Sequence, residues 1–127
     1  MSISNTWENE ILDHIFNNAA APAVAVPYVS LHDGDPGETG ANEITGGSYA
    51  RQSGGFGNAA AGAVANTATI DFTDMPAVTV THVGIWSSST ATASANFVWG
   101  GALTASKAAN AGDTFRIATG DLDVTLD

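Results

Sequence analysis

The first part of the chain has the hydrophobic spacing of an amphipathic helix. Apolar residues recur three and four positions apart between Asn5 and Phe16. The other faces of the predicted helix are expected to carry Glu8, Glu10, Asp13 and His14. The apolar positions are Trp7, Ile11, Leu12, Ile15 and Phe16. Asn5 is the candidate N-cap and Glu8 its capping partner. The pattern predicts one helix with an apolar face that needs a surface to lie on.

From Val26 onwards the hydrophobic period changes to two residues, the period of a β-strand. The predicted strands are Val26–His32, Ser48–Phe56, Ala63–Phe72, Val78–Trp86, Asn96–Leu103, Thr114–Thr119 and Asp121–Leu126. Gly120 is expected to separate the last two as a turn or a bulge. Several short strands separated by turn residues predict an antiparallel β-sandwich or a barrel-like domain.

These patterns divide the chain into three segments. Residues 1–18 form an N-terminal helix or arm, residues 19–27 form a connecting segment that contains Pro22, and residues 28–127 form the β-sandwich domain. The fold class is therefore mainly β with one N-terminal amphipathic helix. The sequence leaves two roles open for the helix, because its apolar face can cover the chain's own sheet or reach a neighbouring subunit.

Two loops stand out between the predicted strands. Residues 33–40 are rich in the turn-forming residues Asp, Gly and Pro, which predicts a long exposed loop. Residues 87–95 contain only Ser, Thr and Ala, which predicts a mobile hairpin tip.

Composition and charge narrow the classes of partner. The chain has 127 residues, 13 Asp and Glu against 3 Lys and Arg, and a formal net charge of −10. So few cations cannot neutralise many phosphates, so no direct partner among nucleic acids is expected. There is no cysteine, which excludes disulfides and thiolate zinc sites.

With 44% hydrophobic and 13% charged residues, the composition differs from that of an acidic disordered tail and is compatible with a surface covered by other protein.

No targeting pattern is visible in the sequence. The first residues lack the basic and apolar regions of a secretory signal, and no run approaches the roughly 20 apolar residues of a membrane span. We expect a protein made in a cytoplasm, without a membrane partner, that leaves the cell only as part of a larger particle.

Catalytic patterns are missing from the sequence. His14, His32 and His82 lie on three different predicted elements, and each is expected to be a partly exposed structural residue. Ser48 lies in GGSYA, which does not match the GxSxG nucleophile elbow. The sequence therefore predicts neither an enzyme nor a cofactor.

Two groups of residues could form a ligand site, and each also has a structural interpretation. Asp33, Asp35 and Glu38 begin like a calcium-binding loop, but the EF-hand spacing then fails, so a turn in which Asp side chains bond their own backbone is preferred. Trp86, Phe97 and Trp99 flank the small-residue loop and suit a sugar-binding platform, but strand alternation favours burial in the core.

Several segments together resemble a family of small tailed-phage virion proteins, often labelled tail fibre proteins, some of which serve as head-decoration or cement proteins. They are SISNTWENEILDHIF, YVSLHDGDPGETG, NEITGGSYAR, THVGIW and GALTASKAANAGDTFRIATGDLDVTLD, in that order. The resemblance departs from the family in 19–27, in 54–65 and in the loop 87–95. It implies a β-sandwich-like protein of the virion that oligomerises, with trimers usual for capsid decoration.

Four functions follow, in order of preference. The first is a capsid decoration protein on the capsid surface, with the major capsid protein and its own copies as partners and Trp7, Ile11, Ile15 and Phe16 as interaction residues. The second is a tail or tail-fibre component that presents loops to a host receptor. A fibre shaft usually shows repeats, and this chain has none. A carbohydrate- or calcium-binding module is third, and a hydrolase is fourth.

Overall fold

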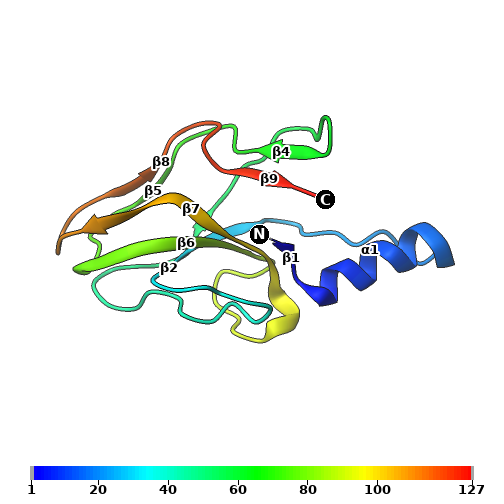
Figure 1. Cartoon of the computed structure of the whole chain (residues 1–127), viewed down its shortest axis with the longest axis horizontal. Helices are drawn as coiled ribbons and strands as arrows, with labels where there is room; N and C mark the ends of the chain where they lie inside the picture. The colour runs from blue at the N-terminus through cyan, green and yellow to red at the C-terminus, as the bar shows by residue number, and fades with distance from the viewer. Residues whose placement is uncertain (1, 127) are drawn as a thin grey trace.

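A computed structural model describes residues 2–126, which form a mainly β structure with one α-helix at the N-terminal end (Figure 1). The elements are β1 (Ser2–Ile3), α1 (Asn5–Asn17), β2 (Tyr28–His32), β3 (Gln52–Ser53), β4 (Ala63–Ala65), β5 (Ile70–Phe72), β6 (Val78–Trp86), a short 3₁₀ turn (Ser94–Asn96), β7 (Phe97–Ala109), β8 (Phe115–Ile117) and β9 (Asp123–Thr125). Every strand pairing among them is antiparallel.

The strands form one large sheet and two small ones. The large sheet has the order β1-β7-β6-β2-β3, and the small sheets pair β4 with β9 and β5 with β8. In the large sheet Val29 is opposite Ile85 and Leu31 is opposite Val83, so these apolar side chains share one face. The two small sheets pack over that face, as the predicted sandwich requires.

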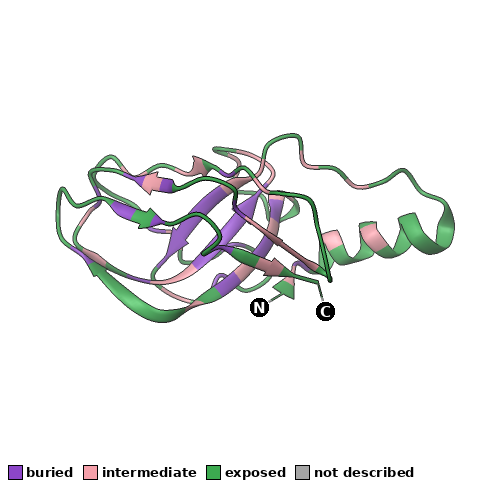
Figure 2. Cartoon of the chain, turned by 90° about the horizontal axis from the view of Figure 1, so that it is seen from above, coloured by how far each residue is buried: buried purple, intermediate pink, exposed green. Residues whose placement is uncertain are grey.

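The core lies between the large sheet and the small sheets, where the buried colour gathers in Figure 2. Its members include Leu31, Ile70, Phe72, Met75, Val83, Ile85, Trp99, Phe115, Ile117 and Leu122. Each such side chain contributes roughly 1.5–3 kcal/mol by leaving water, which makes this layer the main source of stability.

The opposite face of the large sheet is also buried, because loops cover it. Trp86 and Phe97 point to this face and pack edge to face, with ring centroids 5.0 Å apart. Gly40 has φ +74°, and a Cβ on it would lie 2.2 Å from the Trp86 ring. The loop 33–40 was expected to be exposed, and this is wrong for its buried residues Pro36 and Gly40, which lie on the sheet.

The strand boundaries follow the sequence pattern unevenly. Val78–Trp86 is a strand over the predicted residues, whereas the predicted strand Ser48–Phe56 is a strand only at Gln52 and Ser53, with one further isolated bridge from Phe56 to Asn66. The predicted strand Ala63–Phe72 is two strands, β4 and β5, in different small sheets. β7 runs on to Ala109, with a register shift against β6. Gly120, at φ +82°, lies in the turn before β9, in agreement with the predicted break.

Helix α1 begins at Asn5, as predicted, but Ser4 and not Asn5 is the N-cap. The Ser4 carbonyl accepts a hydrogen bond from the Glu8 amide at 2.9 Å. Its hydroxyl makes no cap and donates to the Phe97 carbonyl at 2.6 Å. Glu8 also lies one turn before Leu12, so it belongs to the apolar side of the helix and not to an opposite face.

Past its first residues, α1 extends away from the β domain, and residues 18–27 return beside it to β2 (Figures 1 and 2). Asn18 ends the helix in the left-handed conformation, at φ 54°. No residue of α1 is buried. The helix is therefore an arm whose two ends both join the large sheet.

Candidate assembly interface

The apolar side of α1 is exposed to solvent. Leu12 is 51% exposed, Ile15 is 63% exposed and Phe16 is 76% exposed, while Trp7 and Ile11 are half-buried. All four predicted interaction residues, Trp7, Ile11, Ile15 and Phe16, thus lie on the arm, and the two most exposed are at its far end. A row of large exposed apolar side chains is a common feature of protein interaction sites.

The base of the arm is fixed to the sheet by polar contacts. β1 pairs with β7 at Trp99 and Gly100, and the Ser4 amide donates to the Val98 carbonyl at 2.8 Å. The Asn5 amide donates to Oε2 of Glu38 at 2.6 Å, which places a carboxylate at the positive end of the helix dipole. These contacts orient the arm at its first turn.

The acidic loop uses its carboxylates within the protein. Oδ1 of Asp35 accepts a hydrogen bond from the Gly37 amide at 2.8 Å, which is the backbone-bonded turn expected for Asp, and Glu38 holds the start of α1. Asp33 is exposed. Asp35, Glu38 and His82 do line one small cleft of about 240 Å³. Within residues 2–126, no three His, Asp or Glu side chains are grouped so that they could hold a metal ion.

The three histidines lie in different environments. His14 is exposed on the arm and His82 is half-buried beside the Thr81 hydroxyl. His32 is fully buried, so the expectation that it is a partly exposed strand residue is wrong. Burial lowers the pKa of His32 below its ordinary value, because the charged ring would lose its hydration.

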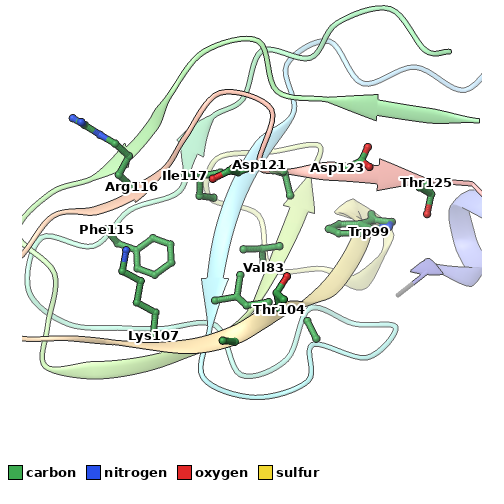
Figure 3. A pocket seen from close by; sticks show the side chains of 14 residues that line it. Val83, Trp99, Thr104, Lys107, Phe115, Arg116, Ile117, Asp121, Asp123 and Thr125 are labelled. Carbon is green, nitrogen blue, oxygen red and sulfur yellow. The ribbon is translucent and has the colours of Figure 1, made fainter.

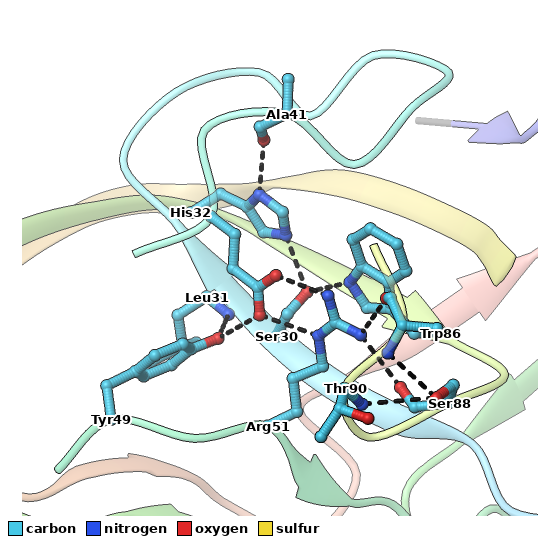
Figure 4. A network of polar contacts seen from close by, with 11 residues as sticks. Ser30, Leu31, His32, Ala41, Tyr49, Arg51, Trp86, Ser88 and Thr90 are labelled. Atoms are coloured by element: carbon cyan, nitrogen blue, oxygen red, sulfur yellow. Dashed lines mark hydrogen bonds and ion pairs between the residues drawn. The ribbon is translucent and has the colours of Figure 1, made fainter. Parts of the chain in front are cut away.

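His32 belongs to a chain of hydrogen bonds that the covering loop completes (Figure 4). Its Nδ1 lies 2.7 Å from the Ala41 carbonyl and its Nε2 lies 2.7 Å from Oγ of Ser30. A carbonyl only accepts, so Nδ1 carries the proton and Nε2 accepts from the Ser30 hydroxyl. Trp86 Nε1 donates to the same hydroxyl oxygen at 2.9 Å. Ser30 and His32 are both 0% exposed, so a substrate has no access to this pair.

Arg51 anchors the second covering loop (Figure 4). Its guanidinium forms a two-point ion pair with Glu43, at 2.9 and 2.7 Å, and donates to the carbonyls of Ser88 and Ala91 at 3.0 and 2.8 Å. The Arg51 side chain is 4% exposed. The loop 87–95 was expected to be a mobile tip, but in the structure these two bonds tie it to the sheet.

The aromatic residues that suited a sugar platform are in the interior. Trp86 is 2% exposed, Phe97 is 0% exposed and Trp99 is 2% exposed, so the preferred expectation of core packing is confirmed. Two indole N–H groups, those of Trp7 and Trp99, are buried without a hydrogen-bond partner. Such a donor costs free energy in a chain that stands alone.

A groove of about 630 Å³ opens between β7 and the strands β8 and β9 (Figure 3). Its lining is Val83, Trp99, Ala102, Leu103, Thr104, Ala105, Lys107, Phe115, Arg116, Ile117, Asp121, Leu122, Asp123 and Thr125. Nζ of Lys107 lies 5.3 Å from the centre of the Phe115 ring, and Arg116 pairs with Asp71 at 2.7 Å. The groove has no local signal in the sequence, because its lining comes from four strands and the turns between them.

No helix in the described part of the chain combines the length and the apolar character that crossing a membrane requires.

Comparison with known proteins identifies one family. No curated protein matched the chain. A family model described as "Podophage GP4 fiber I protein gp80" matches residues 2–125. Because that match spans almost the whole chain, this protein belongs to the family of the podophage GP4 fiber I protein gp80, a family of tailed-phage virion structural proteins.

Proposed function

We propose that this chain is a structural subunit of the phage tail fibre, built into the virion through its exposed arm. The observation that carries the proposal is the match to a podophage fibre protein over residues 2–125, together with the apolar side of α1. A helix of 13 residues is marginal in water when it stands alone, so a partner that covers its apolar side stabilises it.

A structural role without catalysis is part of the proposal. The Ser30–His32 contact is sealed under a loop, and its hydrogen bonds are all used within the protein. The carboxylates Asp35 and Glu38 are likewise occupied by backbone amides. These groups hold loops and the arm in place, which is what an assembly subunit needs.

Capsid decoration is the second candidate function, with the major capsid protein and further copies of this chain as partners and a trimer as the assembly. The observation that favours it is the shape, a short two-layered β domain with one projecting arm (Figure 1). Such a shape suits repeated attachment to a lattice at least as well as a place in a fibre shaft, which is usually built from repeats.

The two candidates differ in copy number, which quantitative mass spectrometry of purified virions measures. A fibre subunit is expected at a small number of copies, far below the major capsid protein, and in the fraction that keeps the tails after heads and tails are separated. A ratio near one per capsid subunit, or one trimer per lattice threefold, would overturn the fibre assignment in favour of decoration. Absence from the particle would overturn both.

A further inference from the structure

We propose that α1 of one copy docks in the β7–β8–β9 groove of a second copy, with Glu8 of the arm facing Lys107 of the groove. This inference rests on the proposed role of the chain as an assembling subunit and names the contact through which copies join. It concerns two surfaces of the same chain, one convex and one concave, that each lack a partner.

The apolar surfaces of the two elements match. The arm presents Leu12, Ile15 and Phe16, which are half to three-quarters exposed. The floor of the groove is formed by apolar side chains, Val83, Trp99, Phe115, Ile117 and Leu122. A space of about 630 Å³ has room for several large side chains of a helix laid along it. The burial of exposed apolar area on both sides supplies the attraction.

The charges explain why the groove is the surface that another copy of this acidic chain selects. The chain carries 13 acidic residues and only three Lys or Arg residues. Arg51 is buried under its own loop and Arg116 is already paired with Asp71, so Lys107 is the cation that remains for a second copy, and it lines this groove. Self-association of a chain at −10 is repulsive at most other surfaces.

The arm supplies the matching carboxylate. Glu8 lies three residues before Ile11 and four before Leu12, so its side chain is on the same side of the helix as the apolar residues that would enter the groove. Glu10 lies on the other side of the helix. Asp123 and Lys107 lie at opposite ends of the groove (Figure 3), so the Lys107 end is the place for Glu8.

The contact is of the head-to-tail type, because arm and groove are different surfaces. In one copy α1 points away from the β domain and leaves its own groove open (Figures 1 and 3). Repeating such a contact closes a ring, for example a trimer, or extends a filament. The indole N–H groups of Trp7, on the arm, and Trp99, at the groove, have no acceptor in the single chain.

A charge exchange tests the pairing in the full-length protein by sedimentation velocity over a concentration series. The wild type is expected to oligomerise, and Glu8→Lys and Lys107→Glu are each expected to weaken association by about tenfold or more. The double variant Glu8→Lys/Lys107→Glu is expected to regain most of it. Glu10→Lys is the matched control, with the same charge change on the other side of the helix, and is expected to associate as well as the wild type or better.

Three results would overturn the contact. They are a monomeric wild type at high micromolar concentration, equal loss in Glu8→Lys and Glu10→Lys, and a double variant as weak as the single ones. The wild type is measured first, and circular dichroism of each variant verifies the fold.

A cross-link gives a second test that does not depend on the charge variants. The chain has no cysteine, so an Ile15→Cys variant and a Thr104→Cys variant each carry a single thiol. Mixed under mild oxidation, they are expected to form a mixed disulfide between arm and groove, since a bridge requires the two Cα atoms within about 7 Å. Ala60→Cys, at an exposed site in another loop, is the control partner for Ile15→Cys. Equal cross-linking to Ala60→Cys and Thr104→Cys would refute the docking site.

Failure of the docking and failure of the proposed function give different results. If the protein is present in virions at fibre copy number but Ile15→Cys and Thr104→Cys do not cross-link, the proposed function stands and the docking of α1 in the groove is refuted. A protein absent from virions would lose the proposed function, whatever its behaviour in solution.

Discussion

The guanidinium carbon of Arg51 lies 3.7 Å from the centre of the Trp86 ring, so a buried cation rests directly on a buried indole. The same guanidinium is paired with Glu43 at two points and holds the carbonyls of the loop 87–95. One side chain thus joins the large sheet to the loops that cover its second face. Its removal tests how much of the fold depends on that cover.

Arg51→Ala is expected to lower the free energy of unfolding by about 3 kcal/mol, because Glu43 keeps its charge in a largely buried position and loses its cation, with only the Tyr49 hydroxyl, at 3.0 Å, still donating to it. Urea denaturation followed by tryptophan fluorescence measures the loss. Arg116→Ala is the matched control, because it removes an equally close ion pair with Asp71 that is exposed to solvent. Similar losses in the two variants would show that the buried ion pair contributes no more to the free energy of unfolding than the exposed one.

His32 predicts a pH dependence of stability. Burial lowers its pKa from the ordinary value of 6.5, so below that pH the unfolded chain binds a proton that the folded chain does not. The free energy of unfolding is expected to fall as the pH drops through 6.5, by at most about 1.4 kcal/mol per pH unit. Thermal unfolding between pH 7.5 and pH 5.5 measures it.

The control for this effect is a pair of histidine variants. His32→Gln is expected to be less stable but to lose most of the slope, and His14→Gln, changed at an exposed site, is expected to keep it. The pKa of Asp71 is also lowered, by its hydrogen bond and ion pair with Arg116, but that carboxyl titrates at lower pH, outside the measured range. An unchanged slope in His32→Gln would contradict the assignment.

Gly40→Ala is expected to destabilise the protein more than Gly112→Ala. Both glycines have positive φ, +74° and +87°, so both changes carry the backbone cost of a side chain there. At Gly40 the new Cβ would also overlap the Trp86 ring, whereas nothing lies within 4 Å at Gly112. The difference is expected to be about 1–3 kcal/mol in chemical denaturation. Equal losses would mean that the loop moves away from Trp86 at no cost.

The exposed apolar side of α1 is expected to contribute little to the fold of a single copy. Ile15→Ser and Phe16→Ser, measured at a dilution where the protein is monomeric, are expected to change the free energy of unfolding by less than about 0.5 kcal/mol. Phe72→Ala, in the core, is expected to cost about 3–5 kcal/mol. A large loss in the arm variants would show that the arm packs on its own domain in solution.

The sequence predicted those elements whose signal is local. The alternation in Val78–Trp86 and the spacing in Asn5–Phe16 are carried by neighbouring residues, and both elements are present with small changes at the ends. The division of Ala63–Phe72 between two sheets was missed, because the period of two continues through Asn66, where the chain changes partner.

The polar network and the groove could not be predicted, because they join residues far apart in the chain. Glu43, Arg51 and Trp86 meet only after the sheet and its covering loop have formed, and nothing near Arg51 in the sequence marks it as buried. Pro36 and Gly40 were assigned to an exposed loop on their turn-forming character, which says how a loop bends but not what it packs against. The helix was predicted correctly, since an apolar helical side can be read from spacing alone, whereas the role of Trp7, Ile11, Ile15 and Phe16 in an interaction stays a prediction.

The two ends of the arm enter the same sheet at different strands, β1 at one edge and β2 beyond β7 and β6. A pull on the far end of α1 is therefore shared between two attachments, one through β1 and Ser4 onto β7, the other through residues 18–27 onto β2. β6 and β7, the two longest strands, lie between these attachments. A tensile load carried from subunit to subunit would pass into the middle of the large sheet, and the peripheral loops would bear little of it.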